Sequence, residues 1–345
     1  MLLLTMAMSC LVGSLLAPTA DAAPPAGRPA AVVALGDSFA AGEGGGSYVA
    51  GTRGERGDWC HRSASAYVQH TGLPGKGIDL GCSGAKSADV GFGGTGHYTE
   101  TSQAQRLVDI ARTNQVSTVL VQVGANDDPA FASSVVGCVA TFLTPGSAAC
   151  STSLAKNWPQ RLASMAPRVQ RALADVRTAM SRAGYSDQGY QLVLLSYPSP
   201  LTETMTRTHG IAGCPFRAED ARWGRTVAAP QLSAALRGVA QRSGARFLDM
   251  SRATEGHEAC TTAGPEWVRR LTVSPQSFVS GGLAAAGHLA QESFHPNALG
   301  YGRLGSCVGQ FVRAGDKEAA CRVGSDGLLH VSPISAPTAA PVAAG

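Results

Sequence analysis

The chain has 345 residues, with 28 Lys or Arg against 24 Asp or Glu, and a mild net charge of +4. The basic residues are scattered along the sequence, which excludes the clustered positive charge typical of a nucleic-acid-binding protein. Hydrophobic residues make up 44% of the chain and recur in periodic segments between the 42 glycines, which indicates a globular protein with long loops.

The N-terminal residues 1–22 have the pattern of a secretion signal peptide. An apolar stretch runs from Leu2 to Leu16, and Ala20-Asp21-Ala22 matches the A-x-A cleavage pattern. The usual basic residues before the apolar stretch are missing, because the first Lys or Arg is Arg28. A membrane anchor is the alternative, but Pro18 and polar residues end the stretch too early for a bilayer span. We therefore expect cleavage after Ala22, a secreted extracellular protein, and no stable membrane insertion.

Short apolar runs predict strands, and amphipathic stretches between them predict helices. The predicted strands are Ala31–Leu35, Ile78–Leu80, Thr118–Val123, Leu192–Ser196 and Arg246–Leu248. The predicted helices are Thr101–Asn114, Leu162–Ala183 and Ala229–Ser243, after which Gly244 suits a C-terminal cap. Strands that alternate with helices are typical of an α/β fold in which a parallel sheet has helices on both sides.

Residues suited to chemistry follow the first three predicted strands. Ser38 follows the first strand, Gly84 the second and Asn126 the third. Because functional loops of a parallel sheet gather beyond the carboxyl ends of its strands, we expect these residues to share one rim. We expect Asp127 to brace this rim by hydrogen bonds rather than to contact a substrate.

The cysteines indicate disulfide bonds. Cys10 lies in the predicted signal peptide, and the remaining cysteines form an even set in an exported chain. No C-x-x-C pair or H-E-x-x-H motif occurs, so we expect no metal site. Roughly a hundred pairings are possible, and pairing neighbours closes the shortest loops. On that basis we choose Cys60–Cys82, Cys138–Cys150, Cys214–Cys260 and Cys307–Cys321.

Two long connections, 129–157 and 199–222, show little periodicity. We expect them to be loops that pack over the sheet rim, held there by disulfide bonds. The mature chain is expected to form one domain over 23–324. Residues 325–345 drift into Pro- and Ala-rich sequence and are expected to be a disordered tail.

Four blocks of the sequence resemble those of the SGNH (GDSL) hydrolases. They are, in the family's order, Gly36-Asp37-Ser38, Gly84, Gly124-x-Asn126-Asp127 and His295-Pro296. The secreted actinobacterial lipase and esterase branch is the more similar one, because it shares the stretches at 36–42, 60–63, 82–85 and 295–297. The resemblance covers about 31–307. It implies a three-layer α/β/α sandwich with a central five-stranded parallel sheet of the flavodoxin-like type.

The resemblance also implies the roles of individual residues. Ser38 is the nucleophile, and His295 is the base that takes its proton. The backbone N–H groups of Ser38 and Gly84, with the side-chain amide of Asn126, form the oxyanion hole. The implied function is that of a secreted esterase, lipase or phospholipase acting on a small-molecule or lipid ester through an acyl-enzyme. No cofactor is implied, and we expect a monomer.

One position departs from the family pattern. The family usually has Asp three residues before the catalytic His, and this chain has Glu292 there, whose extra methylene changes its reach. Some members of the branch use a backbone carbonyl two residues before the His, which is that of Ser293 here. We favour a Ser–His dyad oriented by the Ser293 carbonyl over a triad that includes Glu292.

The same residues also allow other interpretations. Ser38 could merely cap a helix, and Gly84 and Asn126 could be ordinary turn residues. An α/β-hydrolase is the rival architecture, but its nucleophile follows several strands whereas Ser38 follows the first. A carbohydrate deacetylase or acyltransferase that acts on sugar esters is the alternative enzyme. A non-catalytic secreted binding protein that keeps the fold is the alternative outside enzymes.

Overall fold

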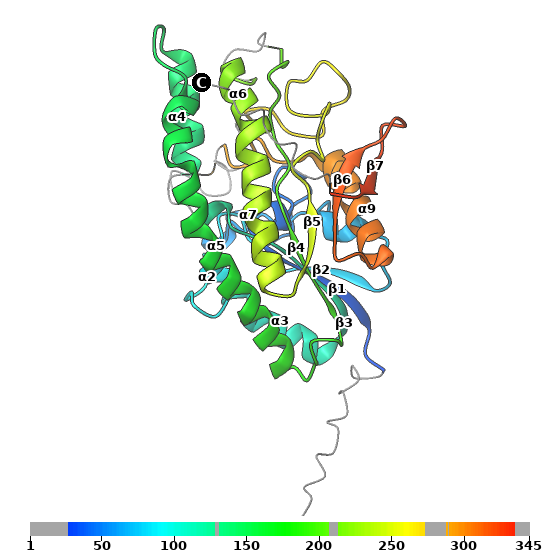
Figure 1. Cartoon of the computed structure of the whole chain (residues 1–345). Coiled ribbons are helices and arrows are strands. Elements are labelled where there is room, and N and C mark those ends of the chain that lie inside the picture. Colours follow the sequence, from blue (N-terminus) through cyan, green and yellow to red (C-terminus); the bar gives the residue numbers. More distant parts are fainter. Residues whose placement is uncertain (1–26, 128–130, 207–212, 273–287, 289, 335–345) are drawn as a thin grey trace, which may run out of the picture.

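A seven-stranded sheet lies at the centre of the computed structural model (Figure 1), which describes residues 27–127, 131–206, 213–272, 288 and 290–334. The strand order is β2-β1-β3-β4-β5-β6-β7; all neighbours are parallel except β6 and β7. The strands are β1 Ala30–Gly36, β2 Lys76–Asp79, β3 Gln115–Gln122, β4 Gln191–Leu195, β5 Arg246–Asp249, β6 Glu318–Val323 and β7 Leu329–Ser332. The first five follow the flavodoxin-like order, in which ligands bind where the order reverses, beside β1 and β3.

Strands β6 and β7 extend the sheet beyond the five strands that the sequence predicted. Strand β7 lies within 325–345, so the expectation of a disordered tail is wrong for the first part of that segment. Leu329 is buried and pairs with Val323, and the Pro- and Ala-rich composition begins only after the strand ends at Ser332. The expected signal peptide and residues 335–345 lie outside the described residues.

The two faces of the sheet are each covered by helices. In β1, Ala31, Val33 and Leu35 belong to one buried cluster, whereas Val32 and Ala34 belong to another, because successive side chains of a strand point to opposite faces. The first cluster includes residues of α3 (Gln103–Thr113), α5 (Cys150–Arg182) and α7 (Ala229–Arg242); the second includes residues of η2 (Tyr67–His70) and α9 (Ala298–Ala314). This three-layer arrangement confirms the predicted α/β/α fold class (Figure 1).

The other helices and helical turns are short or peripheral. They are α1 Ser38–Ala41, α2 Ser87–Val90, α4 Phe131–Leu143, α6 Ala218–Trp223, η1 Glu55–Gly57, η3 Ala125–Asp127 and η5 Gly224–Ala228. The predicted helices at 101–114 and 229–243 match α3 and α7 closely, because capping residues mark their ends. The Ser102 hydroxyl accepts from the backbone N–H of Gln105 at the start of α3, and Gly244 has a φ of 62° just after α7.

The connection 129–157, expected to be a loop, is largely helical. It contains α4 and the first turns of α5, a 33-residue helix that continues through Pro159 and Pro167. Helical periodicity was not visible at 150–161 because few of these residues face the core. Other contacts hold this part: a disulfide joins Cys138 of α4 to Cys150, and the ring of Trp158 packs against Trp223 with centroids 5.8 Å apart.

Helix α9 was missed in the sequence because it contains several glycines, which are poor helix formers. These glycines allow the helix to approach the backbone around η2. A Cβ atom on Gly309 would lie only 1.8 Å from the backbone oxygen of Thr71, so no larger residue fits there. Asn297 is the N-cap of the helix: its side chain accepts from the N–H of Gly300 at 2.9 Å. The start of α9 therefore fixes the chain directly after His295-Pro296.

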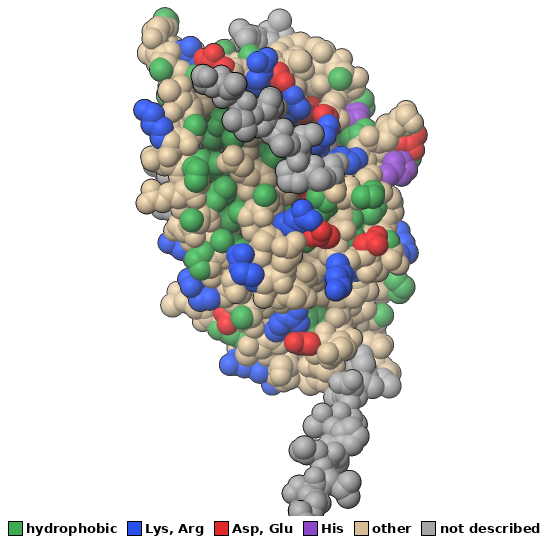
Figure 2. All heavy atoms as spheres, viewed as in Figure 1, with side chains coloured by type: hydrophobic (Ala, Val, Ile, Leu, Met, Phe, Trp, Pro, Cys, Tyr) green, Lys and Arg blue, Asp and Glu red, His purple; other side chains and the backbone are tan. Residues whose placement is uncertain are grey.

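The structure joins the cysteines in four bonds, Cys60–Cys82, Cys138–Cys150, Cys214–Cys260 and Cys307–Cys321, which are the neighbour pairs chosen from the sequence. On the face shown in Figure 2, Lys and Arg side chains are spread among acidic and apolar ones. Within the described ranges, no helix has both the length and the apolar character that a bilayer span requires.

Candidate active site

Ser38 lies at the carboxyl end of β1, where the chain turns into the short helix α1. The carboxylate of Asp37 caps this turn, because it accepts from the backbone N–H of Phe39 at 3.1 Å and from the hydroxyl of Tyr197. The backbone N–H of Asp37 donates to Gln122 of β3 at 3.0 Å. Burial raises the pKa of Asp37 to about 7, opposed by these hydrogen bonds. Asp37 therefore fixes the backbone around Ser38 and does not itself face the reacting atoms.

The structure brings His295 against Ser38, although 257 positions separate them. His295 Nε2 lies 2.7 Å from Ser38 Oγ, and His295 Nδ1 lies 3.0 Å from the backbone oxygen of Ser293. A carbonyl oxygen can only accept, so Nδ1 carries the proton and the Nε2 lone pair faces the Ser38 hydroxyl. This is the geometry in which a serine can lose its proton to an imidazole.

The backbone on both sides of His295 is held by Arg269. The N–H of Phe294 donates to the Arg269 oxygen at 3.1 Å, and the N–H of Arg269 donates to the His295 oxygen at 2.8 Å. Phe294 itself has a φ of 62°, a left-handed conformation that is uncommon for an aromatic residue and needs such support. The ring of Phe39 lies 5.0 Å from the imidazole, so the side chain is held by packing as well.

Burial lowers the pKa of His295, and the negative charge of Glu43 partly opposes this shift. The imidazole is therefore neutral, and able to accept a proton, at neutral pH. The Glu292 carboxylate makes its contacts with other groups: its Oε1 is 3.0 Å from the Tyr48 hydroxyl, and its Oε2 is 3.4 Å from an Arg269 nitrogen. His295 Nδ1 instead faces backbone carbonyls: it lies 3.0 Å from the Ser293 oxygen, and a backbone hydrogen bond with Gln291 also raises the pKa of His295.

Gly84 and Asn126 lie in the loops after β2 and β3, on the same rim as Ser38. Gly84 has a φ of 83°, and a Cβ there would lie 3.2 Å from His97 Nε2. Within the described chain, neither the N–H of Ser38 nor that of Gly84 donates to another group. The Asn126 amide donates to the Ala85 oxygen at 3.1 Å, which ties it to the Gly84 loop. The site thus has two unused backbone donors and a neighbouring amide, the set that an oxyanion requires.

Other hydrogen bonds tie the three loops together. The Asp127 carboxylate accepts from the backbone N–H and the hydroxyl of Ser87, which is the bracing role expected from the sequence. The Tyr197 hydroxyl links Asp37 to the backbone N–H of Ala125, at 3.4 Å. Tyr197 was missed, but it follows the fourth predicted strand, so the same strand-end rule could have found it. Glu43 was missed as well; its signal is an acidic residue within a run of glycines.

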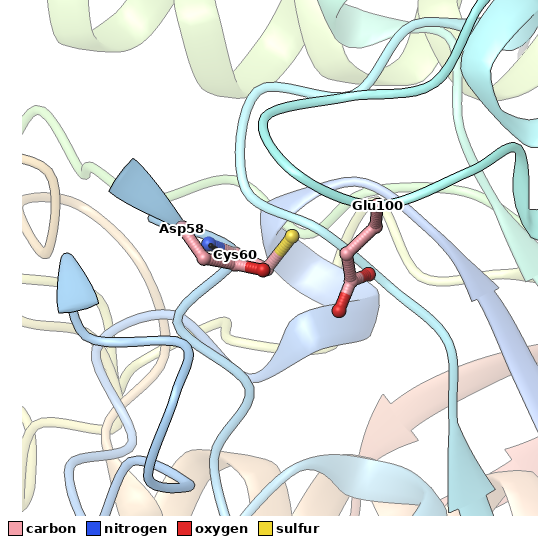
Figure 3. A group of neighbouring side chains, drawn as sticks. All are labelled: Asp58, Cys60 and Glu100. Atoms are coloured by element: carbon pink, nitrogen blue, oxygen red, sulfur yellow. Dashed lines mark hydrogen bonds between the residues drawn. The ribbon is translucent and has the colours of Figure 1, made fainter. Parts of the chain in front are cut away.

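One cluster of potential metal ligands exists among the described residues, formed by Asp58, Cys60 and Glu100 (Figure 3). Its groups are already engaged. The Cys60 sulfur is bonded to Cys82, so no thiolate is available. The Glu100 carboxylate pairs with Arg62 and Arg106, and Asp58 accepts from the Thr99 hydroxyl at 3.0 Å. The donor set therefore does not fit a metal ion.

Comparisons with known proteins agree on one family. A sequence model of the GDSL-like Lipase/Acylhydrolase family matches residues 34–303. "Lipase 2" of Streptomyces coelicolor is 26% identical over 294 residues, which cover 83% of this chain and 87% of the relative.

Two solved structures show the same fold. An extracellular lipase from Streptomyces rimosus has a TM-score of 0.55 and 23% identity, over 79% of this chain and 94% of that one. A phospholipase A1 from Streptomyces albidoflavus has a TM-score of 0.53 and 22% identity, over 81% of this chain and 97% of that one.

Proposed function

The chain belongs to the GDSL-like lipase/acylhydrolase family, and from this we propose that it is a secreted serine esterase or lipase that hydrolyses carboxylic esters through an acyl-enzyme. The observation that carries the proposal is the pair of contacts at His295, 2.7 Å to Ser38 Oγ and 3.0 Å to the Ser293 oxygen. A neutral imidazole held in this way can take the serine proton as the oxygen attacks.

The proposed reaction has two halves. Ser38 Oγ attacks the ester carbonyl carbon while its proton passes to His295 Nε2, and the carbonyl oxygen becomes an oxyanion. The N–H groups of Ser38 and Gly84 and the Asn126 amide donate to this oxyanion. The protonated imidazole then gives its proton to the leaving alcohol, which leaves an ester of Ser38. In the second half, His295 takes a proton from water, and the water oxygen attacks the carbonyl carbon of that ester. The bond from this carbon to Ser38 Oγ then breaks, the imidazolium returns its proton to Ser38 Oγ, and the acid is released.

Two further observations support the oxyanion assignment. The two backbone donors have no acceptor within the described chain, so a substrate oxygen would meet them without breaking a hydrogen bond of the protein. Gly84 has no Cβ, so no side-chain atom blocks a substrate from reaching its N–H.

The similarity to "Lipase 2" of Streptomyces coelicolor supports the substrate class, a carboxylic ester, and not a particular acyl chain.

A panel of substrates tests the proposal and narrows it. The purified protein and Ser38→Ala are assayed on p-nitrophenyl esters from acetyl to palmitoyl, on triglycerides, on phospholipids and on acetylated xylan. We expect hydrolysis of at least one class of acyl ester, lost by about 10⁴-fold or more in Ser38→Ala. Unchanged hydrolysis in that variant would overturn the proposal, and hydrolysis confined to acetylated xylan would favour a carbohydrate deacetylase.

Secretion is part of the proposal. It is supported by the signal-peptide pattern at 1–22 and by the four disulfides, which are typical of exported proteins. N-terminal sequencing of protein recovered from the culture medium should begin at Ala23. Protein that stays in the membrane fraction with residues 1–22 intact would contradict cleavage.

A further inference from the structure

Glu43 is a fully buried carboxylate beside the candidate active site that the proposed reaction does not use. It lies one residue beyond Gly42, the C-cap of α1. Its backbone N–H donates to the Ser38 oxygen at 2.9 Å, and its backbone oxygen accepts from the Tyr301 hydroxyl at 2.8 Å. The backbone of Glu43 is therefore fixed to the nucleophile turn on one side and to helix α9 on the other.

The carboxylate of Glu43 is surrounded by hydrogen-bond donors. Oε1 lies 3.0 Å from His61 Nδ1 and 3.1 Å from the Tyr48 hydroxyl; Oε2 accepts from Ser83 Oγ at 2.5 Å and from Gln291 Nε2 at 2.8 Å. Burial alone would raise the pKa of Glu43, but His61, His295 and Ser83 together hold it below its usual value. A buried carboxylate with this many donors is ionised and well compensated.

Two of these donors, Ser83 and Gln291, come from loops that carry the proposed catalytic groups. Ser83 directly precedes Gly84, so its bond to Glu43 fixes the backbone next to an oxyanion donor. Gln291 begins the segment that ends at His295, and Tyr48 lies between Glu43 and Glu292 of that same segment. Gly44 packs against the His295 loop: a Cβ there would lie 3.0 Å from the Cβ of His295.

We propose that Glu43 is a positioning residue for the hydrolysis proposed above. Its carboxylate joins the nucleophile turn, the Gly84 loop and the His295 loop in one arrangement, and its negative charge favours the imidazolium that forms on His295 when Ser38 loses its proton. The charged groups around His295 are Glu43, Glu292 and Arg269. His61 is a further titratable group, and its Nδ1 lies against the Glu43 carboxylate. Of the two carboxylates, Glu292 is paired with a cation, Arg269, whereas Glu43 is not paired with Lys or Arg among the described residues.

The test compares Glu43→Gln with Glu258→Gln, a matched control. Glu258 is also a buried carboxylate, only 2% exposed, but it accepts from the local N–H of Gly256, and among the described residues no hydrogen bond joins its side chain to the three loops. We expect Glu43→Gln to lower kcat by about 10- to 100-fold with KM nearly unchanged. We also expect a lower pKa of His295, measured by NMR titration of its Cε1 proton. Glu258→Gln should change neither quantity. A folded Glu43→Gln protein with wild-type kcat and an unchanged His295 pKa would overturn the proposal.

A second variant keeps the proposal testable if Glu43→Gln does not fold. Ser83→Ala removes the hydrogen bond from the Ser83 hydroxyl to the Glu43 carboxylate and leaves the negative charge of Glu43 in place. We therefore expect kcat to fall about tenfold while the pKa of His295 stays at the wild-type value. Wild-type kcat in Ser83→Ala, verified as folded by its melting curve, would then overturn the proposal. If the wild-type chain hydrolyses no ester, the proposed function fails, but the NMR comparison of His295 still decides whether Glu43 acts on it.

Discussion

His295 Nδ1 lies 3.0 Å from the backbone oxygen of Ser293, two residues earlier in the chain. A backbone carbonyl can hold the imidazole in one tautomer and one orientation, as a carboxylate does in a Ser-His-Asp triad. It carries no full charge, however, so it stabilises the imidazolium less than a carboxylate would. The Ser293 carbonyl therefore orients the imidazole, and under the proposal above the negative charge comes from a buried group elsewhere, Glu43.

The first prediction concerns Glu292. Glu292→Gln should retain at least a tenth of the wild-type kcat/KM, because the carboxylate contacts Tyr48 and Arg269 while the Ser293 carbonyl orients the imidazole. Loss of an orienting carboxylate in a Ser-His-Asp triad costs about 10⁴-fold. Steady-state kinetics on a p-nitrophenyl ester measures the difference, with His295→Ala as the reference for full loss. A loss of about 10⁴-fold in Glu292→Gln would restore it to the triad.

The second prediction concerns pH. Burial lowers the pKa of His295 below its ordinary value of 6.5. Only the neutral imidazole can take the serine proton, so kcat/KM should rise with pH and reach its plateau after a midpoint below 6.5. A profile of kcat/KM between about pH 4 and 9 in buffers of constant ionic strength measures this midpoint. A midpoint above 6.5 would contradict a lowered pKa of His295.

The fold class and the location of the candidate site could be predicted because both follow from local patterns. The alternation of apolar strands and amphipathic helices predicts the sheet, and the strand-end rule brings Ser38, Gly84 and Asn126 to one rim. Helix α9 could not be predicted in this way, because its glycines lower helix propensity and are used for close packing against Thr71. Strands β6 and β7 have the sequences EAACRV and LHVS, in which charged and polar residues interrupt the apolar ones, so no apolar run marks them.

The carboxylate of Glu43 could not be predicted for a related reason. Its donors lie at 48, 61, 83 and 291, so the cluster exists only after the loops have been brought together by the fold. The choice between Glu292 and Ser293 also depended on the backbone. Only the turn at Phe294, with its φ of 62°, determines which oxygen meets Nδ1.

The third prediction concerns the side-chain donor of the oxyanion hole. Asn126→Ala should lower kcat by about 10²–10³-fold, the usual cost of removing one such donor. The melting temperature should change little, since the Asn126 side chain is only half-buried and makes a single hydrogen bond, to the Ala85 oxygen. Asn114→Ala, at the end of α3, serves as a matched control and should keep wild-type kcat. Wild-type kcat in Asn126→Ala would remove Asn126 from the site.

The fourth prediction concerns the disulfide Cys60–Cys82, which closes a loop of 22 residues next to the site. Replacing both cysteines with Ala should cost about 3 kcal/mol of stability, because the unfolded chain gains conformational freedom. It should also lower kcat, since Ser83 and Gly84 follow Cys82 and the Ser83 N–H donates to the Cys60 oxygen.

The matched control for that disulfide is Cys307–Cys321, which joins α9 to β6 away from the Gly84 loop. Its double Ala variant should lower the melting temperature but leave kcat of the folded protein near the wild-type value. Thermal unfolding followed by circular dichroism, with kinetics at 25 °C, measures both effects. Equal kcat in the two double variants would show that Cys60–Cys82 has no special role at the site.

Covalent labelling identifies the nucleophile without depending on the choice of substrate. The protein is treated with a p-nitrophenyl alkylphosphonate ester, from which an activated serine displaces p-nitrophenolate, and the adduct is located by peptide mass spectrometry. We predict one adduct, on Ser38, with none in Ser38→Ala and very slow labelling in His295→Ala. An adduct on another residue, or labelling of Ser38 that is equally fast without His295, would contradict a Ser38 nucleophile activated by His295.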